Sequence, residues 1–204
     1  HSNVGKTTTA LYLIANAAIR HDWKWVIYSS ENKTASVKMQ LMQFAADRKV
    51  ADMTFAQRKQ AYKWVQKHFT IINNNQVYSY SDIIIFMEKV MNQQHVDAIF
   101  VDPYAEDTEG GGKFVNRADC FITVHRKVQS PDHNIRKMSE FHVRKVREVE
   151  TGGQPTPFDE PYKLIMNLSH TGFNSWETRS ALFQPVHFQG DEQKVIDYGD
   201  FLSK

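Results

Sequence analysis

The chain begins His1-Ser2-Asn3-Val4-Gly5-Lys6-Thr7-Thr8, and this stretch decides the fold. It has the form of a phosphate-binding loop, Gly-x-x-x-x-Gly-Lys-Ser/Thr, with the leading glycine expected one position before His1. Apolar residues at helical spacing follow, so the loop opens onto a helix N-terminus, whose backbone N–H groups and dipole attract phosphate. We therefore expect Ser2 to Thr8 to bind a nucleotide, with Lys6 at its terminal phosphates and Thr7 as a Mg²⁺ ligand.

A second stretch supplies the carboxylate that such a site needs. Residues 97–102 read Asp97-Ala98-Ile99-Phe100-Val101-Asp102, a short apolar run that ends in an acid. This pattern is typical of a strand buried on both faces of a parallel sheet, and ligands bind at the carboxyl ends of such strands. Asp102 is predicted to hold Mg²⁺ together with Thr7.

A third candidate, Glu31, follows another short apolar strand at Trp25-Val26-Ile27-Tyr28-Ser29. One acid aligned with the γ-phosphate can orient the attacking water in phosphoryl transfer. From its position alone, Glu31 is equally compatible with capping the helix that begins near Thr34. Both interpretations remain open on the residues themselves.

Strands and helices alternate through the first half of the chain, which predicts an α/β fold with a mostly parallel sheet and helices on both faces. We expect helices to about residue 20, over 34–48 and 54–68, and through 83–91 with Ser81 as its cap. The expected strands are 24–29, 69–72, 77–80 and 97–102. Later strands at 120–125, 141–146, 162–166 and 183–188 have no crossover helices between them, so they are predicted to add antiparallel strands to the sheet edge.

The order of these motifs resembles the RecA-type motor domain of DnaB-like hexameric replicative helicases, the group that includes phage primase-helicases and Twinkle. Two later stretches strengthen the resemblance, which spans about residues 1–168. They are Asn116-Arg117-Ala118-Asp119-Cys120-Phe121-Ile122-Thr123-Val124-His125-Arg126 and Val143-Arg144-Lys145-Val146-Arg147.

The resemblance implies that Glu31 is the catalytic base, and that Lys145 and Arg147 reach the ATP site of a neighbouring subunit. An arginine delivered in this way stabilises charge on the transferring phosphoryl group. Strict strand alternation would place Lys145 and Arg147 on the same side as Phe141 and Val143. The alternative is a solvated basic strand face.

One departure from the family concerns the sixteen positions between Asp102 and Ala118. The family has a helix, a core strand and DNA-facing loops there, which do not fit into sixteen residues. We expect that a segment is missing near 105–110, and that residues 1–204 are a single RecA-like domain from a longer chain.

Composition limits the remaining choices. Hydrophobic residues make up 41% of the 204 positions, which is enough to fold, and the net charge of +2 provides no global field toward a polyanion. No apolar run approaches the ~20 residues of a membrane span. The lone cysteine, Cys120, and the lack of zinc-type Cys/His spacing fit a reducing cytoplasm. The resemblance implies that this is the cytoplasm of a bacterial or phage-infected cell.

Together these features predict a ring-forming, Mg-ATP-driven DNA helicase motor. Its expected partners are single-stranded DNA, further copies of the chain in a hexameric ring, and a primase domain or protein. A GTP-type switch is disfavoured because Asp102-Pro103-Tyr104-Ala105 and Asn32-Lys33-Thr34-Ala35 lack its motifs. A small-molecule kinase would need no residue from a neighbouring subunit. A RecA-like recombinase and a non-unwinding, DNA-associated assembly ATPase stay open as alternatives.

Overall fold

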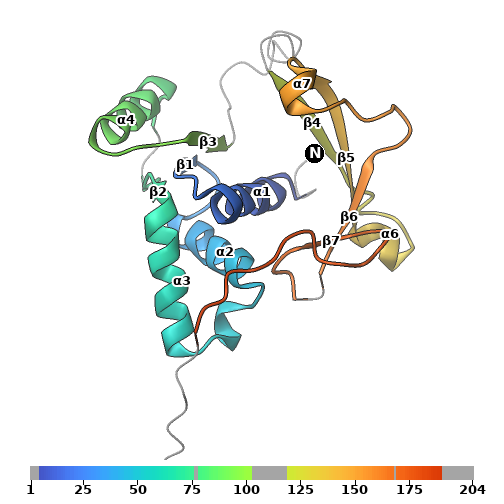
Figure 1. Ribbon diagram of the computed structural model, residues 1–204, viewed down its shortest axis with the longest axis horizontal. Coiled ribbons are helices and arrows are strands. Elements are labelled where there is room, and N and C mark those ends of the chain that lie inside the picture. Colours follow the sequence, from blue (N-terminus) through green and yellow to red (C-terminus); the bar gives the residue numbers. More distant parts are fainter. Residues whose placement is uncertain (1–4, 76–77, 103–118, 168, 190–204) are drawn as a thin grey trace, which may run out of the picture.

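A computed structural model of the chain describes residues 5–75, 78–102, 119–167 and 169–189. Its strands form a parallel sheet of order β2-β1-β3 and an antiparallel sheet of order β4-β5-β6-β7 (Figure 1). The helices are α1 (Lys6–His21), α2 (Thr34–Ala46), α3 (Phe55–His68), α4 (Tyr80–Gln93), α6 (His133–Lys137) and α7 (Val149–Gly152), with a short 3₁₀ turn η1 at Val50–Asp52. The strands are β1 (Trp25–Ser29), β2 (Phe69–Ile71), β3 (Ala98–Asp102), β4 (Cys120–His125), β5 (Met138–Val146), β6 (Tyr162–Met166) and β7 (Phe173–Ser175).

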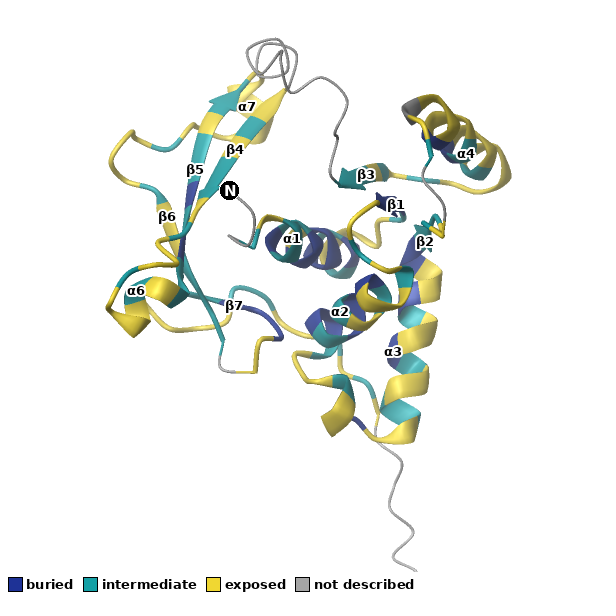
Figure 2. Ribbon diagram, turned by 180° about the vertical axis from the view of Figure 1, so that it is seen from behind, coloured by how far each residue is buried: buried dark blue, intermediate teal, exposed yellow. Residues whose placement is uncertain are grey.

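Strand β1 is the centre of the parallel sheet and is covered on both faces. Ile27 faces the main core with α1, α2 and α3, whereas Val26 and Tyr28 face Ile83 and Met87 of α4. Figure 2 shows the buried residues concentrated on β1 and on the inner sides of α1 and α2. The predicted parallel sheet with helices on both faces is confirmed, because an apolar strand of this kind needs cover on each side.

Two helices begin at capping boxes, in which a side chain at each end of the first turn binds the other's backbone. In α3 the pair is Thr54 and Gln57, and in α4 it is Ser79 and Asp82. The prediction that Ser81 caps α4 is therefore wrong. The strand expected at 77–80 is also wrong for residues 78–80, because the Ser79 cap starts the helix at Tyr80. Val77 lies outside the described residues.

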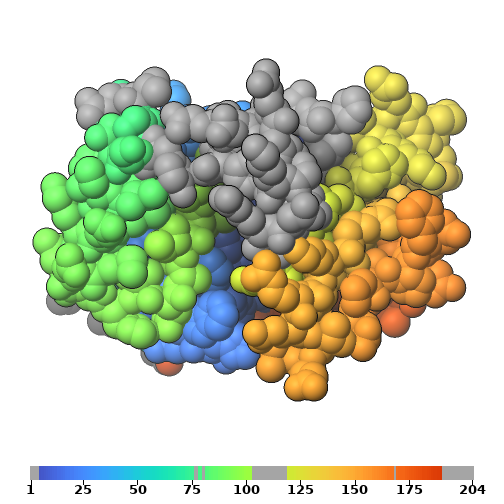
Figure 3. All heavy atoms as spheres, turned by 90° about the horizontal axis from the view of Figure 1, so that it is seen from above, coloured from blue at the N-terminus to red at the C-terminus, as the bar shows by residue number. Residues whose placement is uncertain are grey.

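The antiparallel strands of the second half are confirmed, but they pair in a sheet of their own within the described residues. Figure 3 shows α4 and these strands on opposite sides of the molecule. No strand forms over 183–188, contrary to expectation. Instead this segment packs on the helices, with the Val186 N–H donating to the Ala45 carbonyl at 2.7 Å. Helices α6 and α7 and strand β7 were not predicted.

Strand β5 contains a β-bulge at Arg144. Val143 pairs with Ile122 and Lys145 pairs with Phe121, so Arg144 has no partner in the register. The extra residue reverses the alternation beyond it. Lys145 therefore lies on the opposite face from Phe141 and Val143, and the predicted strict alternation is wrong at this point.

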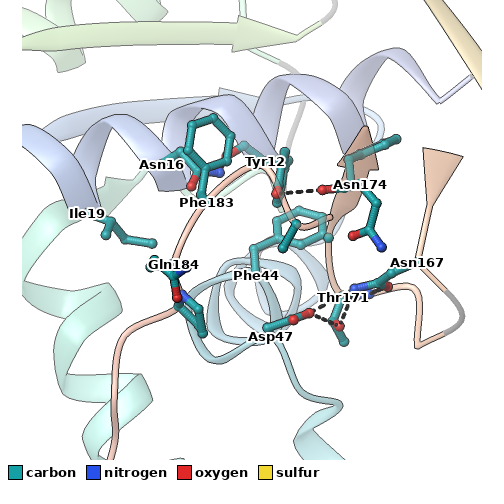
Figure 4. A pocket seen from close by; sticks show the side chains of 14 residues that line it. Tyr12, Asn16, Ile19, Phe44, Asp47, Asn167, Thr171, Asn174, Phe183 and Gln184 are labelled. Carbon is teal, nitrogen blue, oxygen red and sulfur yellow. Dashed lines mark hydrogen bonds between the residues drawn. The ribbon is translucent and has the colours of Figure 1, made fainter. Parts of the chain in front are cut away.

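The antiparallel sheet is joined to the first half through α1 and α2. Thr171, which is fully buried, donates its hydroxyl to Asp47 Oδ1 at 2.7 Å, and Asn167 Nδ2 donates to the same oxygen at 2.8 Å (Figure 4). The hydroxyl of Tyr12 donates to the Phe173 carbonyl at 3.2 Å. Figure 1 shows α1 between the two sheets, so both are held against one helix.

Candidate functional site

The described part of the predicted phosphate loop is its last turn and the helix that follows. Gly5 has φ +86°, a left-handed conformation that glycine adopts without strain, and its carbonyl accepts from Thr9 at 2.9 Å. Lys6 is exposed at the first position of α1, and Thr8 lies in the same turn. Ser2, Asn3 and Val4 lie outside the described residues. The observed turn into a helix is the context that the motif requires.

The predicted metal ligands lie together. Thr7 Oγ1 donates to Asp102 Oδ2 at 2.6 Å, and both side chains are partly buried. They come from the start of α1 and the carboxyl end of β3. A hydroxyl oxygen and a carboxylate oxygen are ligands that suit Mg²⁺, which usually keeps several waters beside one or two protein ligands. The two residues therefore fit the ion that the sequence predicts for them.

Glu31 lies just after β1, the neighbour of β3 in the parallel sheet. The register pairs Ser29 with Asp102, and the Ser30 N–H donates to the Asp102 carbonyl at 2.8 Å, so the loop that carries Glu31 begins at the same sheet edge. Glu31 is exposed and lines an open hollow with Lys33 and Lys38. It does not cap α2, because the N-cap is Lys33 and no side chain caps that helix.

Sequence reasoning missed Asn74, which holds the loop after β1. Its Nδ2 group lies 2.8 Å from the Ser29 carbonyl, 2.9 Å from the Asn32 carbonyl and 3.4 Å from the Ser30 carbonyl. Asn74 follows β2, the neighbour of β1 in the sheet. The signal in the sequence was a polar Asn73-Asn74-Asn75 run just after a short apolar strand, the position at which a parallel sheet presents its functional edge.

Lys145 and Arg147 lie elsewhere in the same chain, at the end of the antiparallel strand β5. Figures 1 and 2 both show this end of the strand, beside α7, away from the carboxyl ends of β1 and β3. Arg147 Nη1 forms an ion pair with Asp119 Oδ1 at 2.5 Å, and the Arg147 N–H donates to the Asp119 carbonyl. The fold thus brings Thr7, Asp102 and Glu31 to one edge but places the predicted finger residues on another sheet.

Two further searches concern only the part of the chain that the structure describes. No group of three or more His, Cys, Asp or Glu side chains in it is arranged to hold a metal ion. Among its helices, none is both long enough and apolar enough to cross a membrane.

Comparison of the sequence with known protein families and with curated proteins finds no match. Comparison of the structure finds a DnaB-like replicative helicase, described with its primase interactions, at a TM-score of 0.58 and 14% identity over 85% of this chain. A second solved structure, described as an ATPase domain, has a TM-score of 0.51 and 13% sequence identity. The match covers 85% of this chain and 81% of that domain. A KaiC-like protein of the archaeon Pyrococcus horikoshii has a TM-score of 0.49 and 13% sequence identity, and the match covers 86% of each chain.

The first two of these solved structures define the fold. The chain has a RecA-type α/β fold, and the resemblance to DnaB-like helicase domains expected from the motifs is confirmed at that level. The chain spans 55% of the length of the DnaB-like helicase that it matches.

Proposed function

We propose that this chain is the ATP-hydrolysing motor domain of a ring-forming DNA helicase. The observation that carries the proposal is the hydrogen bond between Thr7 and Asp102, at the sheet edge from which the Glu31 loop also starts. A phosphate-loop threonine, a strand-end aspartate and a strand-end glutamate are the parts that a RecA-type ATPase needs. Unwinding, DNA binding and ring assembly are proposed from the similarity in fold to the DnaB-like helicase, which covers only part of that protein.

Each residue has a separate role in this proposal. The loop from Ser2 to Thr8 binds the phosphates, and Lys6 places its ammonium at the terminal phosphate. Thr7 and Asp102 hold Mg²⁺, which when bound neutralises charge on the phosphate oxygens. Glu31 orients a water in line with the γ-phosphate and accepts its proton as the bond to the β-phosphate oxygen breaks.

Lys145 and Arg147 are proposed to act on the ATP of the neighbouring subunit. Within its own chain Arg147 is at the surface, with 51% of its side chain exposed in the ion pair with Asp119. Exposed pairs of this kind contribute little to stability, so exchanging Asp119 for a phosphoryl group costs little. Such a contact would make hydrolysis depend on assembly.

The experiment is ATP hydrolysis by the purified protein at increasing protein concentration, with and without single-stranded DNA. We expect a rate that rises more steeply than linearly with protein and rises further with DNA, because complete sites form only between subunits. Glu31→Gln should lower kcat by about 10²- to 10³-fold and leave ATP binding nearly unchanged.

A matched control is Glu150→Gln, an exposed glutamate in α7, which should hydrolyse ATP as the wild type does. A rate that is linear in protein and indifferent to DNA would replace this proposal with a self-contained ATPase or kinase. Strand-exchange activity would instead favour a recombinase.

A further inference from the structure

We infer that Asn74 is a positioning residue for hydrolysis. Its side-chain amide holds the loop that carries Glu31 at the sheet edge where the Thr7–Asp102 pair lies. The inference rests on the proposed function and deepens it. It assigns a role to a residue in the segment that follows β2, and neither β2 nor this segment contributes another residue to the predicted machinery.

The loop from Ser29 to Asn32 is tied from two sides. On one side, the Ser30 N–H donates to the Asp102 carbonyl at 2.8 Å, which connects the loop to β3. On the other side, Asn74 Nδ2 lies within 2.9 Å of the carbonyls of Ser29 and Asn32. Glu31 lies between these tied residues, so both tethers limit where its backbone can move.

Only a donor can occupy the place of the Asn74 amide. Three carbonyl oxygens, those of Ser29, Ser30 and Asn32, face it, and an NH₂ group supplies two hydrogens for them. The pairing of β1 with β2 ends at Ile27 and Ile71, so β2 has no paired residue opposite these carbonyls. Asn74 therefore replaces sheet hydrogen bonds at the point where the chain leaves the sheet.

The position of Glu31 matters because its own side chain is exposed. Packing does not fix the orientation of an exposed carboxylate, so the position of the Glu31 carboxylate depends on the backbone of its loop. Displacement of a catalytic group by about 1 Å can cost roughly 10²-fold in rate. Asn74 acts only through Glu31 in this account, and this makes the inference testable by a double-mutant cycle.

The experiment compares wild type, Asn74→Asp, Glu31→Gln and the double variant in single-turnover ATP hydrolysis. Asn74→Asp keeps the shape but turns an acceptor toward the three carbonyls, so we expect the rate to fall by roughly 10²-fold, with ATP affinity changed less than about threefold. In the Glu31→Gln background the same substitution should change the rate by less than about twofold.

Three further variants separate the amide from charge and folding. Asn75→Asp places the same charge one residue away on an exposed side chain, and should keep the wild-type rate. Asn74→Ala removes the donors without adding charge and should lose rate as Asn74→Asp does. Asn74→Gln keeps the amide and should recover part of the rate. Melting temperatures are measured for all variants.

The outcomes separate the two proposals. If Glu31→Gln is as active as wild type, the proposed function fails and the role of Asn74 fails with it. If Glu31→Gln loses rate as expected but Asn74→Asp hydrolyses normally, or the two losses multiply in the double variant, only the role of Asn74 is overturned. A loss of ATP affinity or melting temperature that accounts for the lower rate would make Asn74 a residue of the fold instead.

Discussion

Thr7 and Asp102 are separated by 95 positions and meet through a single hydrogen bond. Thr7 is fixed by the first turn of α1, and Asp102 by its register opposite Ser29 of β1. The hydroxyl donates its proton to the carboxylate and keeps its lone pairs for another partner. The pair is thus arranged to share a cation without moving either backbone.

Substitution of Thr7 tests this pair. Thr7→Val keeps the shape but lacks the hydroxyl, so we expect the Mg²⁺ concentration for half-maximal ATP hydrolysis to rise by roughly tenfold or more. Thr7→Ser keeps the oxygen and should stay close to wild type. Titration of Mg²⁺ at saturating ATP measures the difference. Equal Mg²⁺ dependence of the valine and serine variants would mean that the hydroxyl contacts no ion.

At the scale of elements, the contact between the β6–β7 turn and the end of α2 joins the two halves of the molecule. Thr171 and Asn167 both donate to Asp47, and Asp47 ends α2 in a left-handed conformation with φ +44°. Removing the fully buried Thr171 hydroxyl deletes one of the two hydrogen bonds to Asp47 Oδ1, and a hydrogen bond to a charged group contributes about 1.5–3 kcal/mol.

We therefore expect Thr171→Val to lower the free energy of unfolding by about 1–3 kcal/mol. Thr178→Val, at an exposed position in the same region, should change it by less than about 0.5 kcal/mol. Urea denaturation followed by circular dichroism measures both. If Thr171→Val were as stable as wild type, the Asp47 contact would not hold the two halves together.

The end of α3 carries a buried histidine. His68 is 3% exposed, with Nδ1 3.1 Å from the Trp23 carbonyl oxygen and Nε2 3.6 Å from Asp22 Oδ1. Burial lowers the pKa of His68 below its usual 6.5, and Lys67 adds to this, whereas the Trp23 and Asp22 contacts oppose it. The native state therefore favours neutral His68.

This shift predicts how stability depends on pH. As the pH falls below about 6.5, the unfolded chain protonates His68 before the folded chain does, so the free energy of unfolding falls. Above that pH the residue makes no pH-dependent contribution. The urea midpoint of wild type should decrease between pH 7.5 and 5, and His68→Gln should show a smaller decrease. Identical pH slopes would contradict the neutral assignment.

At the scale of the whole molecule, the proposed function divides the site between two subunits. Thr7, Asp102 and Glu31 lie at the edge of the parallel sheet, whereas Lys145 and Arg147 end a strand of the other sheet. Beyond the bulge at Arg144 the strand alternates normally, so Lys145, opposite Phe121, and Arg147, whose N–H donates to the Asp119 carbonyl, share a face.

A mixing experiment tests the divided site. Arg147→Ala and Glu31→Gln should each abolish DNA-stimulated hydrolysis, and an equimolar mixture should recover part of it, because some interfaces then combine an intact Glu31 with an intact Arg147. Arg144→Ala is the control, since its guanidinium stacks on Phe158 of its own chain. A mixture no more active than the separate variants would place Arg147 outside the neighbour's site.

The local pattern of the sequence was enough to determine the main elements and the three residues at the sheet edge. Short apolar runs that end in polar residues locate Asp102 and Glu31 at strand ends, and the Gly-Lys-Thr turn locates Thr7 at the start of a helix. These signals are local, because hydrophobic periodicity and the chemistry of turns act within a few residues. The parallel arrangement follows from the alternation of strands and helices.

Tertiary structure alone decided the contacts between distant segments. Three examples depend on how separate elements meet. The Asn74 amide contacts carbonyls at the end of β1, and Thr171 donates to Asp47. The extra residue at Arg144 reverses the alternation of side chains along β5. The short sequence 183–188 has strand-like composition, yet it packs on the helices, where the Val186 N–H donates to the Ala45 carbonyl. The partner that each strand or loop meets depends on the assembled fold, because it joins segments that are far apart in the sequence.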